Sequence, residues 1–159
     1  MQTFGFVQSA GPAVIIILFV LIGLIPAIFY LITLQDTLKR VKQKNRTIEP
    51  GQVWLNLIPF FSIVWQFIMI NRIADSLKAE FNERGITVKE DRPGAQLGVT
   101  YCILNLCAIV PVLGGLAALG GLVCWIIYWV KMAEYKNQLT VINESVLDDN
   151  VLDNFDLEV

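Results

Sequence analysis

Long apolar stretches alternate with short charged segments along this chain. Three stretches contain no Asp, Glu, Lys or Arg: residues 1–35, 50–71 and 93–130. Hydrocarbon cannot solvate ions, and a helix needs about 20 apolar residues to cross a bilayer, so these stretches are candidate membrane-embedded segments. The third has 38 residues, too many for one crossing, and suits a helical hairpin. The pattern predicts an all-α integral membrane helical bundle with three to four membrane-embedded segments.

We expect a single membrane domain over residues 1–142, followed by an acidic C-terminal tail over residues 143–159. The embedded segments are predicted at about 13–34, 53–71, 96–112 and 115–131. The first is about 33 Å long as a helix, which is enough to cross. It is longer than the apolar core of a secretory signal, and no cation precedes Lys39, so we expect a retained span.

Charged helical extensions are predicted to continue the embedded segments. After the first segment, Leu34, Leu38 and Val41 share one face, which indicates an amphipathic helix lying at the level of the lipid headgroups. Five cations surround this face and serve either as a topology anchor or as a contact for anionic lipid or a partner. They are Lys39, Arg40, Lys42, Lys44 and Arg46.

A second charged helix is predicted over residues 71–84. Ile73, Leu77 and Phe81 form an apolar stripe at helical spacing, and Gly85 is a natural helix stop. The spacing also predicts three ion pairs along this helix, Arg72–Asp75, Asp75–Lys78 and Glu80–Arg84.

The segment 53–71 has two interpretations. It is about 27 Å long as a helix, just short of a comfortable crossing, and it contains Pro59. If it crosses, the 12 cations divide five against seven between the two membrane sides, which is almost no bias. If it turns back around Pro59, all 12 become cytoplasmic, as the positive-inside rule favours, and the N-terminus lies outside. We favour the re-entrant form.

Composition excludes several functions. Hydrophobic residues make up 55% of the chain, mean hydropathy is +0.60, and the net charge of −2 gives no basic surface for nucleic acid. Histidine is absent, and Cys102, Cys107 and Cys124 form no CxxC pair. The apolar stretches carry no ionisable group for proton coupling. We therefore predict no catalytic, cofactor-binding or metal-binding residues, and no enzyme activity.

Polar and small residues within the apolar stretches are candidates for contacts between helices. Asn56, Gln66 and Asn105 either hydrogen-bond across helices or line a hydrated path between protomers. The small-residue pairs Gly114/Ala118 and Ala117/Gly121 allow close helix packing, and we expect them to support a homo-oligomer.

The tail contains six acidic residues from Glu144 onward and no basic residue. Leu147, Val151 and Phe155 recur every four residues, so a helical tail would carry an apolar stripe on an acidic surface. The tail is either a frayed terminus, a docking helix for a cytoplasmic protein partner, or a clasp on residues 39–46.

Residues 55–59 and 104–111 share one plan, in which Leu-Asn-Leu precedes a proline within an apolar stretch. Each is followed by an apolar segment and then a charged helix, beginning Arg72-Ile73-Ala74-Asp75 and Lys131-Met132-Ala133-Glu134. Either duplication of one segment or chance similarity between apolar sequences would explain the shared plan.

Several strings resemble one protein family. They are PGQVWLNLIPFF (50–61), ADSL (74–77), EF (80–81), RG (84–85), GVTY (98–101) and CWIIYWVK (124–131). Over residues 45–139 they are similar to a family of small bacterial multi-spanning membrane proteins with no established activity. The resemblance excludes the first span and the tail. It implies a bacterial cytoplasmic membrane and says nothing of catalysis.

We therefore expect a non-enzymatic multi-pass membrane protein, a self-associating scaffold or accessory subunit that engages a cytoplasmic partner or anionic lipid. The alternative is an oligomeric membrane pore or channel lined by Asn56, Gln66 and Asn105.

Overall fold

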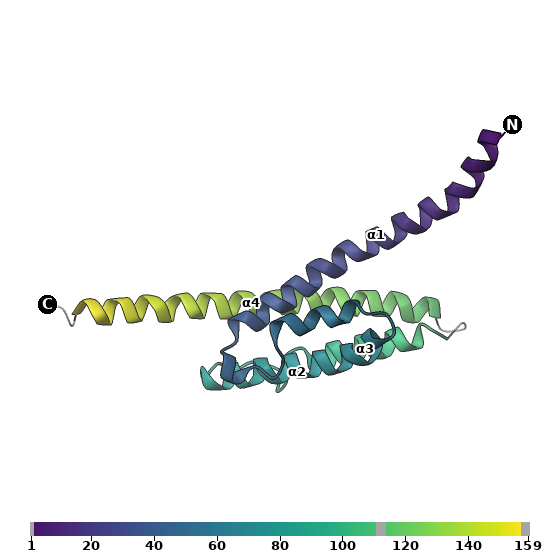
Figure 1. Cartoon of the computed structure of the whole chain (residues 1–159). Helices are drawn as coiled ribbons and strands as arrows, with labels where there is room; N and C mark the ends of the chain where they lie inside the picture. Colours follow the sequence, from purple (N-terminus) through teal and green to yellow (C-terminus); the bar gives the residue numbers. More distant parts are fainter. Residues whose placement is uncertain (1, 111–113, 157–159) are drawn as a thin grey trace. The chain divides into compact units, whose positions relative to one another are not determined.

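The computed structural model describes the backbone of residues 2–110 and 114–156, and side chains from Val14 to Val146 apart from 16, 17, 19, 20 and 111–113. Its helices are α1 (Gln2–Arg40), α2 (Phe61–Glu83), α3 (Ala95–Cys107) and α4 (Gly114–Asp156), shown in Figure 1. Two 3₁₀ helices, η1 (Gln43–Asn45) and η2 (Pro50–Leu57), connect α1 to α2. The described residues contain no β-strand, so the all-α prediction is confirmed.

The chain divides into two compact units, residues 1–32 and residues 33–159. Within the first unit α1 is uninterrupted, and apolar side chains such as Ile22 and Ile25 are exposed. Among the described helices, two segments are long and apolar enough to cross a membrane, Leu21–Arg40 of α1 and Gly114–Val146 of α4. The apolar helix α3 has only 13 residues.

In the second unit α3 packs antiparallel to both α2 and α4. Its start, at Gly98, lies beside Ile70 of α2 and Tyr128 of α4. Near its end, Leu104 lies beside Gly120 and Gly121 of α4. A Cβ added at Gly98 would come within 2.4 Å of Ile70 Cγ2, so the three helices can approach this closely only because residue 98 has no side chain.

The last two turns of α1 run alongside α4. Trp129 Nε1 donates to Thr33 Oγ1 at 3.0 Å, and Thr37 Oγ1 donates to the Met132 carbonyl at 3.3 Å. Leu34 and Leu38 are fully buried within the protein. The prediction that this face lies on lipid headgroups is therefore wrong, because other parts of the chain cover it.

The backbone breaks within the predicted segment 53–71. The 3₁₀ helix η2 ends at Leu57, Pro59 follows, and Phe60 adopts a left-handed conformation with φ of 66° before α2 begins. Proline has no N–H to continue the helix, which accounts for the break. After the break the chain turns back, and α2 lies close to η2: Trp65 Nε1 of α2 donates to the Gln52 carbonyl of η2 at 3.1 Å.

Two predicted helix ends can be compared with the structure. At Gly85 (φ 67°), the Ile86 N–H donates to the Phe81 carbonyl and the Gly85 N–H to the Asn82 carbonyl, a Schellman stop that confirms the prediction. In contrast, α4 does not end near Ile142 as expected but continues to Asp156. The described backbone of α4 has no turn that would fold the tail back onto residues 39–46, so the clasp is not formed.

Candidate functional site

Burial reverses along the helices of the second unit. In α4, Leu116 and Leu119 are exposed on the N-terminal side of Lys131, whereas Met132, Tyr135 and Leu139 beyond it are buried. α2 shows a similar change in the opposite direction. Before Arg72 it has both exposed apolar residues and the buried Trp65, Met69 and Ile70, whereas after Arg72 its large apolar residues are all buried. Exposed residues of α2 are Phe61, Ile63, Val64 and Ile68, and buried ones are Ile73, Leu77 and Phe81.

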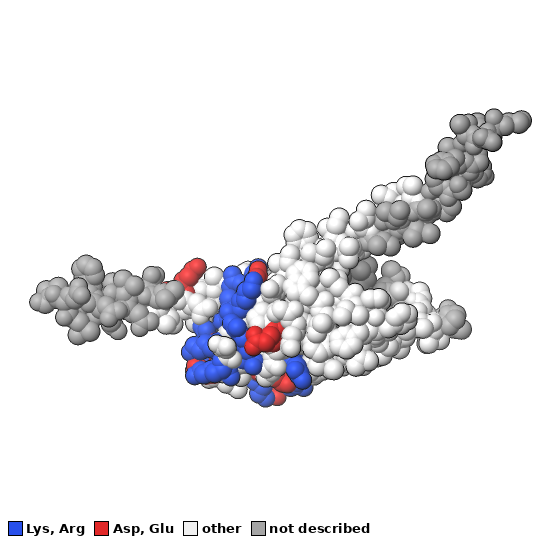
Figure 2. Space-filling model, in the orientation of Figure 1, with Lys and Arg blue, Asp and Glu red and all other residues white. Residues whose placement is uncertain are grey.

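Among the described side chains of this unit, the charged ones gather at one end, on the face that Figure 2 shows. We call the part formed by residues 33–49, 72–94 and 131–146 the charged end, and the part formed by residues 50–71, 95–110 and 114–130 the apolar half. The described residues of the apolar half include no Asp, Glu, Lys or Arg. The charged end has the organisation of a water-soluble protein, with apolar residues inside and charges outside. The apolar half has apolar residues both inside and on its surface.

A buried carboxylate organises the charged end. Glu80 of α2 is fully buried and accepts hydrogen bonds from the Lys42 backbone N–H at 2.9 Å, Asn45 Nδ2 at 2.7 Å and Arg84 Nε at 2.7 Å. Burial raises the pKa of Glu80, but the hydrogen bonds from Asn45 and Arg84 outweigh it and hold the pKa below its usual value. Glu80 therefore stays ionised and fastens η1 to α2. This confirms the predicted Glu80–Arg84 pair.

The neighbouring Glu83 binds the same loop from the surface. Its carboxylate lies 2.6 Å from Lys42 Nζ and 3.0 Å from Lys44 Nζ, and accepts from Asn45 Nδ2 at 2.8 Å. Hydrogen bonds from Lys42, Asn45 and Lys44 lower the pKa of Glu83 to about 2. Two of the five predicted contact cations thus hold the loop in place.

The other three cations also have partners within the chain. Lys39 pairs with Asp36 at 3.5 Å, and Arg40 donates to Thr140 Oγ1 of α4. Arg46 donates to the carbonyls of Val41 and Lys39, both at 2.8 Å. Lys39, Lys42 and Lys44 remain at least half exposed. The contact with lipid or a partner predicted for these five residues remains a prediction, and their contacts within the chain are structural.

The loop between α2 and α3 is fastened by three ion pairs. Arg92 pairs with Asp75 at 2.7 Å, Asp91 with Lys78 at 2.8 Å, and Glu90 with Lys131 of α4. The predicted pairs Arg72–Asp75 and Asp75–Lys78 are therefore wrong, because the loop supplies closer partners than the helix. Together these pairs tie α2, the loop and α4 into one structure.

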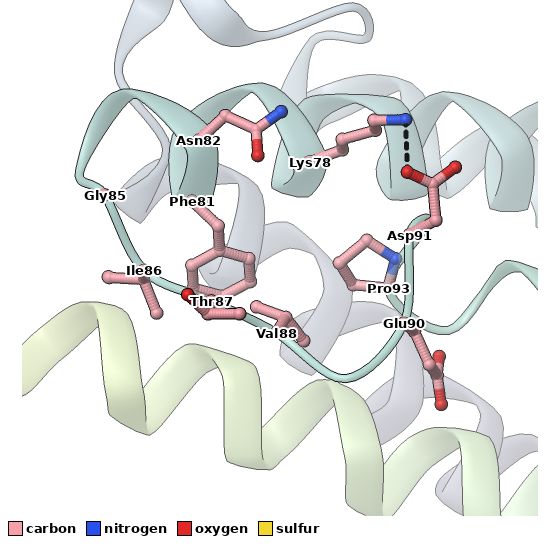
Figure 3. A pocket seen from close by; sticks show the side chains of 10 residues that line it. All are labelled: Lys78, Phe81, Asn82, Gly85, Ile86, Thr87, Val88, Glu90, Asp91 and Pro93. Atoms are coloured by element: carbon pink, nitrogen blue, oxygen red, sulfur yellow. Dashed lines mark hydrogen bonds and ion pairs between the residues drawn. The ribbon is translucent and has the colours of Figure 1, made fainter.

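A cavity of about 330 Å³ lies under this loop, against the end of α2 (Figure 3). Phe81 and Val88 lie between α2 and the loop, and the paired Lys78 and Asp91 lie at one side. The described residues include no group of His, Cys, Asp or Glu able to hold a metal ion.

The predicted pore-lining residues are partly brought together. Gln66 of α2 and Asn105 of α3 line one groove of about 300 Å³ between these helices, together with Ser62 and Cys102. Asn56 lies on η2 and does not line this groove. Its Oδ1 is buried and has no hydrogen-bond partner among the described residues.

The small residues predicted to support self-association pack inside the chain. Ala117 and Gly121 are buried, and Gly121 lies against Leu104 and Asn105 of α3. A Cβ at Gly114 would come within 2.7 Å of the Ala108 carbonyl oxygen, so this glycine permits the tight approach of α3 to α4. Ala118 is exposed. Within the chain, Gly121 is thus used for packing against α3, and the predicted homo-oligomer remains a prediction.

The role of Glu80 was not predicted from the sequence, although its position carries a signal. Glu80 is three residues after Leu77 and seven after Ile73, so it falls on the buried face of α2. A carboxylate on such a face requires buried donors. The donors on η1 could not be identified from helical spacing, because they lie more than 30 residues away.

The comparisons with known proteins add no relative. No protein-family model, no curated protein and no solved structure matches this chain. The resemblance to small bacterial membrane proteins therefore remains a prediction. What the structure itself establishes is an all-helical chain with two segments able to cross a membrane and with its charges gathered at one end of the second unit.

Proposed function

We propose that this protein is a non-enzymatic scaffold of a lipid membrane, with the apolar half in hydrocarbon and the charged end in water on the cytoplasmic side. The observation that supports it is the reversal of burial at Arg72 and Lys131. Exposed apolar side chains cost free energy in water, about 25 cal/mol per Å², and none in lipid. The charged end carries its charges on the surface, so it is more stable in water than in lipid.

The charged end would act as a rigid platform. Its loops are held by the buried Glu80 and by the ion pairs of Asp75, Asp91 and Glu90, so it can present a fixed surface. α4 continues beyond Thr140, where it contacts Arg40, to Asp156, with Val141 exposed. The acidic residues of this extension suit a partner with a basic surface that accepts a helix.

A partner pull-down tests this role. The full chain and a chain ending after Ile142 are compared as baits in membranes solubilised under the same conditions. A partner retained only by the full chain, and lost at high salt, supports docking through the acidic helix. Equal recovery of the same proteins by both baits contradicts it.

A pore is the second candidate, because Gln66 and Asn105 lie in one groove. The test measures ion flux through liposomes that contain the chain. A lower flux in Asn105→Leu, but not in the control Asn56→Leu outside the groove, would support a pore. Absence of flux with the native chain would exclude it and leave the scaffold.

Side-specific labelling tests the membrane placement. Cys102, Cys107 and Cys124 are replaced by Ala, and single cysteines are introduced at the exposed positions Gln43 and Asn82. Intact cells receive a membrane-impermeant maleimide. We expect both positions to be protected until the membrane is permeabilised, and a cysteine at Gln2 to be labelled at once. Labelling of position 43 or 82 in intact cells contradicts the proposal.

A further inference from the structure

Two hairpins in the second unit turn at the same end. η2 and α2 are joined at residues 58–60, and α3 and α4 are joined beyond Cys107. Ile63 near the first turn and Ile109 at the second line the same groove between α2 and α3, so the two turns lie at one level. At the other end, Thr47 donates to the Arg72 carbonyl at 2.6 Å, and Lys131 pairs with Glu90. Both hairpins therefore start and finish at the charged end.

The hairpins are short compared with a bilayer. α3 has 13 residues, about 20 Å at 1.5 Å per residue, and the uncharged part of α4, residues 114–130, is about 26 Å long. The apolar part of α2, residues 61–71, is about 16 Å long. The hydrocarbon of a bilayer is about 30 Å thick. Measured from the charged end, both turns stop before the far surface.

The turns carry no side chain that requires water. Residues 57–61 are Leu-Ile-Pro-Phe-Phe, and residues 106–113 are Leu-Cys-Ala-Ile-Val-Pro-Val-Leu. Among the described side chains at these turns, Phe60 is 89% exposed and Ile109 is 71% exposed. A turn that emerged into water would place these apolar groups there at a cost.

Six backbone donors in the described parts of the two turns are satisfied within the chain. In the first turn, the N–H groups of Ile58, Phe61 and Ser62 donate to the carbonyls of Leu55, Pro59 and Ile58 at 2.8–3.2 Å. In the second, the N–H groups of Ala108, Ile109 and Val110 donate to carbonyls three or four residues earlier. Hydrocarbon tolerates irregular backbone only when its polar groups are satisfied in this way.

We infer that both hairpins enter the membrane from the charged side and end inside the hydrocarbon, so that this unit prefers a bilayer whose charged-side leaflet is convex. The inference rests on the proposed membrane scaffold and names its lipid partner. Because both hairpins begin at the charged side and stop before the far surface, they take up more area in the charged-side leaflet than in the other one. When one leaflet is expanded relative to the other, the bilayer bends so that the expanded leaflet is convex, as with amphipathic helices inserted from one side.

Labelling from both sides tests the depth of the turns. The full chain without native cysteines carries a single cysteine at Phe60, Ile109 or the control position Asn82, in sealed vesicles of each orientation. We expect Phe60→Cys and Ile109→Cys to resist the impermeant maleimide from both sides and to react after detergent is added. Asn82→Cys should react from the charged side only.

The outcomes separate this inference from the proposed function. If Ile109→Cys is labelled from the side opposite to Asn82→Cys, α3 and α4 both cross the membrane. This result overturns the inference and leaves the proposed scaffold intact. Labelling of position 43 on the side opposite position 82 overturns the scaffold. Circular dichroism of each variant, compared with the parent chain, shows whether the helices are retained.

Curvature preference is measured on tubes pulled from giant vesicles of phosphatidylethanolamine and phosphatidylglycerol, with the charged end outward. We expect the fluorescently labelled chain to be enriched in the tube over the vesicle by about twofold or more. Equal density in tube and vesicle, or depletion from the tube, overturns the preference for convex surfaces.

Discussion

The two parts of α4 on either side of Lys131 belong to one helix but are built for different surroundings. Before Lys131, Leu116 and Leu119 are exposed, and beyond it Met132 and Leu139 are buried. Large exposed apolar side chains are frequent before Lys131, whereas beyond it most apolar side chains up to Leu139 are buried and Val141 is exposed. This change supports the proposed placement, with hydrocarbon around the first part and water around the second. α2 leads to the same conclusion at Arg72.

The difference also shows how each part is stabilised. The charged end combines a buried apolar core with ion pairs that join its loops. In the apolar half, helices contact each other at Gly98, Gly114 and Gly121, where side chains are absent. Close backbone approach is the usual means of helix association in lipid, where there is no hydrophobic driving force between helices.

The largest effect is expected when a charge enters the apolar half. Leu119 is 64% exposed and Val141 is 65% exposed, so they form a matched pair. Leu119→Lys should destabilise the chain in bilayers by about 3–4 kcal/mol, because hydrocarbon does not solvate the ammonium. Val141→Lys should change stability by less than about 0.5 kcal/mol. Unfolding in lipid bicelles measures both, and equal effects would remove the distinction between the two parts.

Removing the buried carboxylate should be the next most damaging change. Glu80→Leu leaves the Arg84 guanidinium and the Lys42 backbone N–H without their acceptor and should cost about 3 kcal/mol, the lower end for a broken buried pair. Glu83→Leu, on the surface, is the control and should cost less. The same unfolding measurement applies. If the two variants are equally stable, Glu80 does not organise the charged end.

Filling the contact at Gly98 should be less costly. Gly98→Ala places a methyl group 2.4 Å from Ile70 and 3.1 Å from Tyr128, and overpacking of this kind costs about 1–3 kcal/mol. Gly115→Ala meets nothing within 4 Å and serves as the control. Thermal unfolding in the same detergent compares them, and a Gly98→Ala variant as stable as the control would show that α2, α3 and α4 do not meet there.

The smallest effect is a local response to acid. The folded pKa of Glu83 is about 2, below its ordinary value of 4.5, so its contribution to stability is complete above pH 4.5. That contribution is lost as pH falls from about 4.5 toward 2. Hydrogen exchange should show faster exchange around η1 over this range in the native chain, and Glu83→Gln should weaken the response. Unchanged exchange in the native chain would contradict the assigned contacts.

Sequence patterns predicted faces and ends of helices but not their partners. The stripe Ile73, Leu77 and Phe81 and the stop at Gly85 follow from spacing, and both are present. The stripe at Leu34 and Leu38 was also recognised, but lipid was assigned where protein covers it. Periodicity identifies a buried face and does not say what buries it.

The same limit explains the errors in the candidate site. Ala117 and Gly121 indicated close packing correctly, but not that the partner is α3 of the same chain. The pairs Lys131–Glu90 and Arg92–Asp75 join residues distant in sequence, whereas the predicted pairs were local. A loop that folds back over α2 competes for Asp75 and Lys78, and helical spacing contains no information about that loop.

One measurement tests the change of medium along α4 most directly. Spin labels are attached to single cysteines at Leu119 and Val141, whose exposed fractions are nearly equal, in the full chain reconstituted into liposomes. We predict that the label at position 119 is accessible to oxygen and shielded from a water-soluble nickel reagent, and that the label at position 141 shows the reverse. Equal access of the nickel reagent to both positions would place both in water and contradict the account.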